Sequence, residues 1–160
     1  MNSVRITGGK KLKGEVVPQG AKNEALQILA AVLLTAEEVE LKNIPEIRDI
    51  LRMIELLKGL GVKVNKLGKG RYTFKSDEIN LDYFHTEEFR TKGAAIRGSI
   101  MIIGPLLARF GIGFIPSPGG DKIGRRRLDT HFIGFENLGA EFTYHKDSGF
   151  YKVEAKKLKG

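Results

Sequence analysis

The chain contains an internal repeat, which limits its possible folds to those built from copies of one unit. The segments GAKNEALQILAAVLLTAEEVELKNIP, from Gly20, and GAAIRGSIMIIGPLLARFGIGFIPSP, from Gly93, share an opening Gly-Ala, a long apolar helix-like stretch with Leu-Leu, a strand-like run and a proline. Their offset is 73 positions, and further along LKGLGVKV matches FENLGAEF at an offset of 78. Self-similarity of this kind predicts one supersecondary unit that is built twice.

The change in offset indicates that the second copy has gained five residues, which fall in GGDKIGRRR, residues 119–127. The two units therefore cover about residues 20–79 and 93–158. The sequence KKLKG occurs at residues 10–14 and again at 156–160, twice 73 positions apart. We therefore expect that a third unit would begin at residues 156–160, where this sequence ends.

Hydrophobic periodicity predicts the same order of elements in both units: a helix, a strand, a second helix and a strand pair. Leu26, Leu29 and Leu33 lie on one face of the first helix. The predicted strands are VELKNI and GFIPS, the predicted second helices are residues 47–57 and 128–138, and the predicted hairpins are VKVNKLGKGRYTF and EFTYHKDSGFYKV. The fold class is therefore α/β, with helices packed against a mixed sheet.

The composition of the chain limits the classes of partner that it could bind. The 160 residues include 27 basic and 19 acidic side chains, a net charge of +8, so the surface attracts anions such as nucleic acid, acidic lipid or phosphorylated small molecules. Because the chain has no cysteine, thiolate nucleophiles and cysteine-ligated zinc are excluded, and a reducing compartment, the cytoplasm, is expected. The longest apolar runs, residues 25–34 and 100–108, are too short to span a membrane.

The extra residues of the second copy have the chemistry of a phosphate site. Gly119, Gly120 and Gly124 allow backbone N–H groups to approach an anion closely, and the three arginines 125–127 can pair with phosphate oxygens. The alternative is a hairpin-like turn with a solvated basic tip. Asp121 lies beside these arginines, whose positive charge favours the ionised carboxylate, so it could act as an acid only if a polyanionic substrate neutralised them and excluded water. Otherwise Asp121 is a loop cap or pairs with an arginine.

Two further places are candidate anion sites. Lys22 and Asn23 fall at the start of the first apolar helix, where free N–H groups favour an anion, although Asn23 could simply cap that helix. Arg97 has only small or apolar neighbours, so its charge must leave the core or meet a partner such as a ligand phosphate. His85, His131 and His145 have no metal-site spacing, and no metal is expected.

Taken together, GAKNEALQILAAVLLT, AAIRGSIMIIGPLLARFG and PGGDKIGRRRLDTHFIGFENLGAEF resemble the UDP-N-acetylglucosamine enolpyruvyl transferases from Arg5 to Gly160. The resemblance implies enzymes that transfer the enolpyruvyl group of phosphoenolpyruvate to the 3′-hydroxyl of UDP-N-acetylglucosamine, with no cofactor or metal. It also implies an inside-out α/β barrel of six repeated βαβαββ units in two domains, of which this chain has about two. Residues 1–19 would supply strands to the other domain, and residues 20–160 would form most of one domain.

The resemblance also implies roles for individual residues. Lys22 and Asn23 would contact phosphoenolpyruvate, and Arg97 would bind the UDP-sugar. The segment that holds the nucleotide would be Arg126, Arg127, Leu128, Asp129 and Thr130. Asp121 stands where cysteine is the commonest residue and would be the catalytic acid, and Arg127 replaces a common proline.

Three expectations follow for the partners. The substrates would be phosphoenolpyruvate and UDP-N-acetylglucosamine, and the missing second domain would complete the cleft, so the chain alone is expected to be inactive. A sister enzyme of the shikimate pathway shares the architecture, but RRRLDTH disfavours it. A basic nucleic-acid-binding module is the remaining alternative, which the absence of an aromatic stacking platform opposes, so neither nucleic acid nor a membrane is an expected partner.

Overall fold

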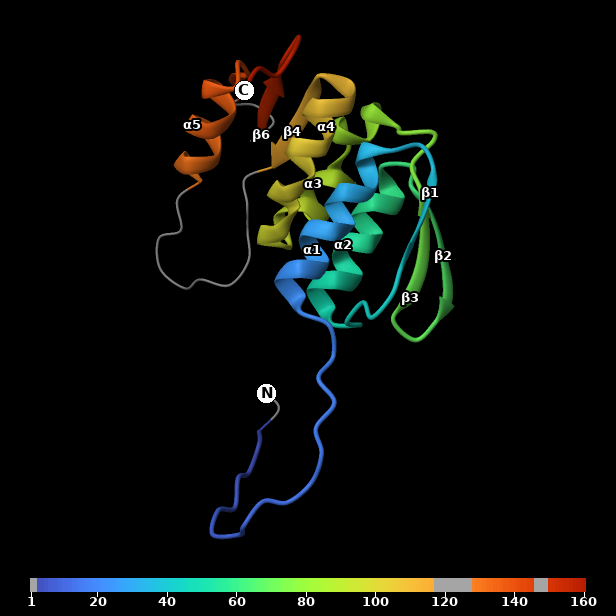
Figure 1. Ribbon diagram of the computed structural model, residues 1–160. Helices are drawn as coiled ribbons and strands as arrows, with labels where there is room; N and C mark the ends of the chain where they lie inside the picture. The colour runs from blue at the N-terminus through green and yellow to red at the C-terminus, as the bar shows by residue number, and fades with distance from the viewer. Residues whose placement is uncertain (1–2, 117–127, 146–149) are drawn as a thin grey trace.

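The computed structural model describes residues 3–116, 128–145 and 150–160 and contains the element order of the repeat twice (Figure 1). The first unit comprises α1 (Lys22–Ala31), the 3-10 turn η1 (Val32–Leu34), β1 (Glu38–Leu41), α2 (Arg48–Gly59), β2 (Lys63–Gly68) and β3 (Arg71–Lys75). The second comprises η3 (Arg97–Ile102), α4 (Ile103–Phe110), β4 (Ile112–Pro116), α5 (Asp129–Asn137), β5 (Glu141–His145) and β6 (Phe150–Glu154). Between them lie η2 (Leu81–His85) and α3 (Glu87–Ala94).

Each unit has its own three-stranded sheet, and the two sheets have the same topology. The strand orders are β1-β3-β2 and β4-β6-β5, and every neighbouring pair is antiparallel. The prediction of a mixed sheet is therefore wrong. The last strand of each unit folds back from its hairpin partner and inserts between the other two strands, so β1 and β2, which run in the same direction, are never neighbours.

The Leu-Gly pair that marked the repeat ends the second helix of each unit in the same way. Gly61 and Gly139 have φ angles of 96° and 91°, the left-handed region that glycine adopts without strain. The N–H of Gly61 donates to Lys58 O at 2.9 Å and that of Val62 to Leu57 O at 3.1 Å. Around Gly139 the equivalent bonds join residues 139 to 136 and 140 to 135, both at 2.9 Å. Both ends are Schellman motifs, which confirms the repeat at this position.

The apolar faces of these elements form two cores. The larger one lies between α1, α2, α3 and the first sheet, and its fully buried aromatic side chains are Phe74, Phe84 and Phe89. Phe114 and Phe150 of the second sheet also belong to it, so this core joins the two units. The smaller core contains Ile103, Leu107 and Val153 among others, and α5 contributes no fully buried residue.

Residues 3–19 run away from this body without forming a helix or strand (Figure 1). Their apolar side chains are 83–95% exposed: Val4, Ile6, Leu12, Val16 and Val17. The strands predicted for residues 1–19 are therefore not formed in the described part of this segment. A strand needs a neighbour to pair its backbone groups, and no described strand pairs with it. The assignment of residues 1–19 to another domain stays a prediction.

Within the described ranges, no single helix has the length and apolar composition to cross a membrane; the bent pair Glu87–Ala94 and Arg97–Phe110 reaches both only when its two halves are taken together.

Candidate functional site at the start of the first two helices

The helices α1 and α2 lie side by side and begin at the same end of the molecule (Figure 1). Lys22 is the first residue of α1, and its Nζ forms an ion pair with Asp49 in the first turn of α2. Both side chains remain partly open to solvent. Two helix N-termini with positive ends and a lysine between them form an electrostatic environment that suits an anion.

Asn23 does not cap α1, so the capping alternative is wrong. The N-cap residue is Ala21, which has no side-chain acceptor, and Asn23 is the second residue of the helix with an exposed side chain. The N-cap residue therefore makes no side-chain hydrogen bond to the first N–H groups of α1. Such groups are the donors that bind a carboxylate or phosphate at a helix start.

Gly20 fixes the start of α1 against the loop that precedes α2. A Cβ atom at this position would lie 2.0 Å from the carbonyl oxygen of Asn43 and 3.2 Å from Cδ of Pro45. Only glycine permits this approach, so the opening glycine of GAKNEAL has a packing role that the sequence pattern did not reveal.

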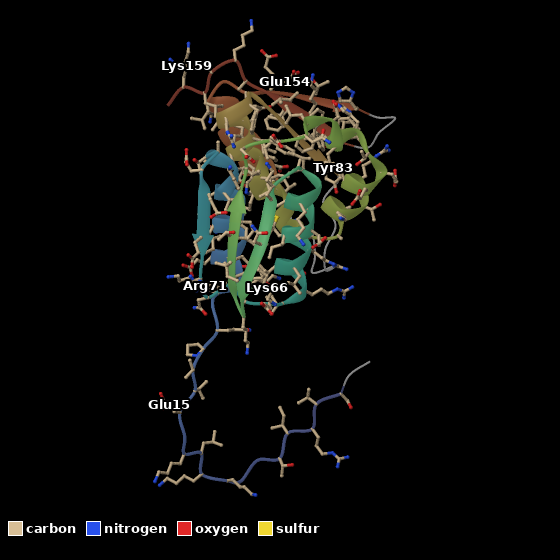
Figure 2. All side chains as sticks on the ribbon, turned by 90° about the vertical axis from the view of Figure 1, so that its right-hand side faces the viewer. Glu15, Lys66, Arg71, Tyr83, Glu154 and Lys159 are labelled. Atoms are coloured by element: carbon tan, nitrogen blue, oxygen red, sulfur yellow. The ribbon has the colours of Figure 1, made fainter. Side chains whose placement is uncertain are left out.

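Glu46 fastens the same loop to the β2–β3 hairpin. Its carboxylate accepts hydrogen bonds from the Gly70 N–H at 3.0 Å and the Tyr72 hydroxyl at 2.9 Å, and it pairs with Lys66 Nζ at 2.8 Å. The Gly70 hydrogen bond, followed by those of Lys66 and Tyr72, lowers the pKa of Glu46 to about 2. Figure 2 shows Lys66 at the end of the sheet from which the N-terminal segment extends.

Replacing Glu46 with glutamine is expected to lower the free energy of unfolding at pH 7. It should also make the free energy of unfolding change less with pH below about 4.5. The depressed pKa means that the carboxylate stabilises the fold above pH 4.5 and loses this contribution as the pH falls toward about 2. Urea unfolding at several pH values between 7 and 2.5 measures this. Glu136→Gln, on the exposed surface of α5, is the control, and parallel pH profiles for wild type and E46Q would contradict the assignment.

Arg97 opens η3 and is half-buried. The next residue, Gly98, packs so tightly on α1 that a Cβ there would lie 2.9 Å from Cδ1 of Leu26. The buried Ser99 hydroxyl lies 2.8 Å from Gly93 O and 2.9 Å from Ile96 O and closes the turn that carries the arginine. The Arg97 segment therefore packs on α1 one turn beyond Lys22.

The other predicted site residues follow the second-copy insertion. Asp121, Arg126 and Arg127 lie outside the described residues. Leu128 immediately precedes α5 and is only 9% exposed in the smaller core, whereas Asp129 is the half-buried first residue of α5 and Thr130 is exposed. Figure 1 shows α5 apart from α1 and α2. The structure therefore brings the Arg97 segment to the helix of Lys22 and Asn23 but does not bring residues 128–130 to it.

The sequence patterns did not single out Arg48 and Asp49. They are the first two residues of α2, next to the start of α1, and Asp49 is the partner of Lys22. The available signal was IRDIL, in which both charges immediately precede the apolar face of the second helix. Their proximity to Lys22 depends on how the two helices pack.

The structure also has a cavity of about 1290 Å³ that is not part of this site. It lies between the end of α4, Gly139 and the segment after β6, and its lining includes Glu154 and Lys159. Figure 2 shows these two residues at the opposite end of the molecule from Lys66. Of the predicted site residues that the structure describes, none lines it.

Comparison with protein families gives a match over residues 6–160 to the EPSP synthase (3-phosphoshikimate 1-carboxyvinyltransferase) family. The chain belongs to this family. Within it, all 160 residues align at 54% identity with the UDP-N-acetylglucosamine 1-carboxyvinyltransferase of Bacteroides fragilis and at 51% with that of Porphyromonas gingivalis. These alignments confirm the resemblance found in the motifs. The chain spans 37% of the length of each of these relatives.

Solved structures support the fold. The enolpyruvyl transferase NikO from Streptomyces tendae is similar with a TM-score of 0.65 at 21% identity, over 94% of this chain and 32% of that one. The EPSP synthase of Acinetobacter baumannii gives 0.60 at 15% identity, over 96% and 34%. At such identities the likeness concerns the fold alone, and it confirms the α/β enolpyruvyl transferase fold class. The count of six units in a whole barrel stays a prediction.

Proposed function

We propose that this chain is part of an enzyme that transfers the enolpyruvyl group of phosphoenolpyruvate to the 3′-hydroxyl of UDP-N-acetylglucosamine and releases phosphate. This reaction is the first committed step of peptidoglycan synthesis. The observation that carries the proposal is identity above 50% along the whole chain to proteins named for this reaction. The cytoplasm is the proposed location, and a second domain is proposed to complete the cleft.

Lys22 and Asn23 are the proposed contacts of phosphoenolpyruvate. Support comes from the start of α1, where the N-cap residue Ala21 offers no side-chain acceptor to the first N–H groups and Lys22 adds positive charge. The Lys22–Asp49 pair is exposed enough for a dianionic ligand to compete for the lysine. Arg97, on the segment packed against the same helix, is the proposed contact of the UDP-sugar. The proposed nucleotide-holding segment is Arg126, Arg127, Leu128, Asp129 and Thr130.

Asp121 is the proposed acid. Protonation of the methylene carbon of phosphoenolpyruvate makes the neighbouring carbon electrophilic, so the 3′-hydroxyl oxygen adds there and gives up its O–H proton. Loss of phosphate and of a methyl proton then restores the double bond. A positioned acid contributes about 10²–10⁴-fold to a rate.

In an enzyme that contains the whole cleft, Asp121→Ala is expected to slow phosphate release by about 10³-fold while nucleotide binding is retained. Retained turnover would remove Asp121 from this role. Because a carboxylate replaces the thiol, alkylation by the antibiotic fosfomycin is not expected.

The first test of the function is a titration of this chain with UDP-N-acetylglucosamine, followed residue by residue by NMR. Saturable shifts at Arg97 and at residues 126–130 are expected. Shikimate 3-phosphate is the matched control, since it is the acceptor of the sister enzyme in the same family, and it should give no saturable shifts. The reverse preference would assign the chain to the shikimate enzyme instead.

A further inference from the structure

Arg52 joins α2 to the segment that carries Arg97. Its side chain is half-buried, and Nη1 donates a hydrogen bond to the carbonyl oxygen of Ala95 at 3.1 Å. The two residues are 43 positions apart in the sequence. Neither the motifs of this chain nor its net charge singled Arg52 out.

The acceptor lies where a guanidinium is most effective. Ala95 is the C-cap of α3, and its carbonyl lies at the negative end of that helix, where a cationic donor is favoured. Ile96 follows in an extended conformation and is 2% exposed, and Arg97 comes next. The bond from Arg52 therefore holds the chain two residues before Arg97, and Gly98 on Leu26 holds it one residue after.

The same helix also contacts Lys22. Asp49 precedes Arg52 by three positions, so the two lie on neighbouring turns of one face of α2. Asp49 pairs with Lys22, and Arg52 bonds to the Arg97 segment. Consecutive turns of α2 thus set the positions of two cationic groups that come from distant parts of the sequence.

We propose that Arg52 is a positioning residue that fixes Arg97 relative to Lys22 in the substrate site. The inference rests on the proposed function for the role of these two cations, and on the hydrogen bond for the positioning. Arg52 acts through the backbone of residues 95–97 and is not a contact of the ligand. Its planar guanidinium keeps the direction of the bond, which a lysine could meet only in part.

The test compares Arg52→Met, which keeps the apolar stem and removes the donor, with Arg52→Lys, which keeps a charged donor. Lys58→Met is the control, because Lys58 lies at the other end of α2 and pairs with Glu55, three positions earlier on the same helix, at 2.9 Å. The first readout needs no ligand. It is the hydrogen-exchange rate of the Ser99 backbone N–H, which donates a hydrogen bond to Ile96 O. Loss of a charge-assisted hydrogen bond is expected to speed it about tenfold in R52M, less in R52K and not at all in K58M. Amides of β3 should be unchanged in all three.

The second readout is the affinity for UDP-N-acetylglucosamine, expected to fall about tenfold in R52M and to be partly restored in R52K. Unchanged Ser99 exchange, an equal rise throughout the protein, or faster exchange with unchanged affinity would each overturn the positioning role. The two proposals fail separately. An enzyme that contains the whole cleft and does not bind the nucleotide sugar would contradict the proposed function, whereas Ser99 exchange decides whether Arg52 fixes the segment.

Discussion

Replacing Gly61 with alanine is expected to lower the free energy of unfolding by about 3 kcal/mol, whereas the same change at Gly139, its equivalent in the second unit, is expected to cost about 1 kcal/mol. Both glycines have left-handed φ angles, so an alanine at either position would be strained by its Cβ. At Gly61 the new Cβ would also lie 2.4 Å from the carbonyl oxygen of Glu78, while at Gly139 the nearest atom is Lys157 O at 3.7 Å. The difference of about 2 kcal/mol is the cost of the backbone clash.

The clash at Gly61 cannot be relieved cheaply. The N–H of Asn80 donates to Leu60 O at 2.9 Å, which holds residues 78–80 against the end of α2. Urea unfolding of the two variants, followed by circular dichroism, measures both costs. Equal losses at the two positions would show that left-handed strain alone matters and that residues 78–80 can move away.

Features that depend on local sequence were predicted well. The second helices, predicted at 47–57 and 128–138, are Arg48–Gly59 and Asp129–Asn137. Their ends were visible in the Leu-Gly pairs because a left-handed glycine is a local requirement of a helix end. The repeat itself was visible because each unit buries its apolar residues in the same pattern.

The second copy departs from the first where tertiary contacts override the pattern. Gly20-Ala21 precedes α1, but the matching Gly93-Ala94 lies at the end of α3, and the apolar stretch after it is divided into η3 and α4. The hydrogen bonds of Ser99 and Arg52 hold this break. Because Arg52 comes from α2, 43 positions away from its acceptor, periodicity alone could not locate the break.

The candidate site was predictable by residue type and only partly by geometry. Lys22, Asn23 and Arg97 stood out as cations or donors in apolar surroundings, and packing brings their segments together. Asp49 was missed because its importance arises from the pairing of α1 with α2. The mixed sheet was predicted wrongly because strand pairing is set by neighbours distant in sequence, and the strands assigned to residues 1–19 stay a prediction because their neighbours would lie in another domain.

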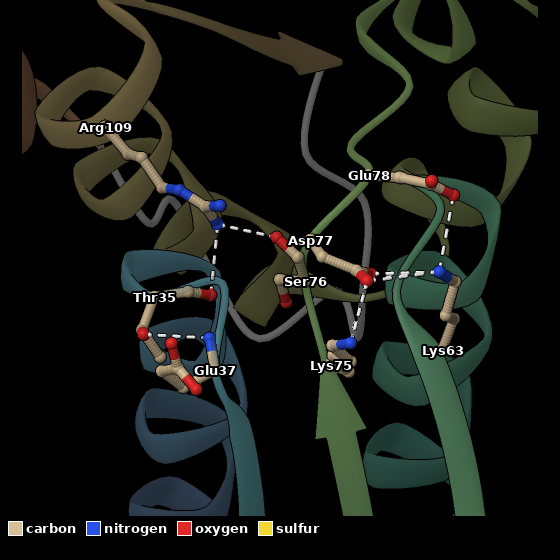
Figure 3. Close-up of polar contacts among 8 residues, drawn as sticks. All are labelled: Thr35, Glu37, Lys63, Lys75, Ser76, Asp77, Glu78 and Arg109. Atoms are coloured by element: carbon tan, nitrogen blue, oxygen red, sulfur yellow. Dashed lines mark hydrogen bonds and ion pairs between the residues drawn. The ribbon is translucent and has the colours of Figure 1, made fainter.

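The second large effect is expected at Arg109, where methionine should lower the free energy of unfolding by about 3 kcal/mol. Arg109 lies at the end of α4, and its Nη1 donates toward three carbonyl oxygens of the first unit: Leu33 at 3.0 Å, Thr35 at 3.1 Å and Ser76 at 2.8 Å. Figure 3 shows the guanidinium between the Thr35 turn and the end of β3. One side chain of the second unit therefore satisfies acceptors from two separate segments of the first.

The Ser76 carbonyl cannot readily turn to water when the donor is removed, because its neighbours are held by ion pairs. Asp77, next to Ser76, pairs with Lys63 and with Lys75, each at 3.1 Å, and Glu78 pairs with Lys63 at 3.3 Å (Figure 3). The lysines hold the segment in place, and hydrogen bonds from Lys75 and Lys63 keep the pKa of Asp77 below its usual value. R109M should therefore leave partly buried acceptors without a donor, which costs more than the bonds themselves contribute.

Arg109→Lys separates the geometry of this contact from its charge. Lys92→Met is the control for the loss of a charge at the surface. A lysine keeps the positive charge but lacks the planar fork, so R109K should recover only part of the loss. Lys92 forms an i,i+4 pair with Glu88 at 2.7 Å on the surface of α3, and its removal should cost less than about 1 kcal/mol. Urea unfolding measures all three variants. Full stability in R109K would mean that charge is sufficient, and a loss in R109M no larger than in K92M would show that Arg109 does not hold the two units together.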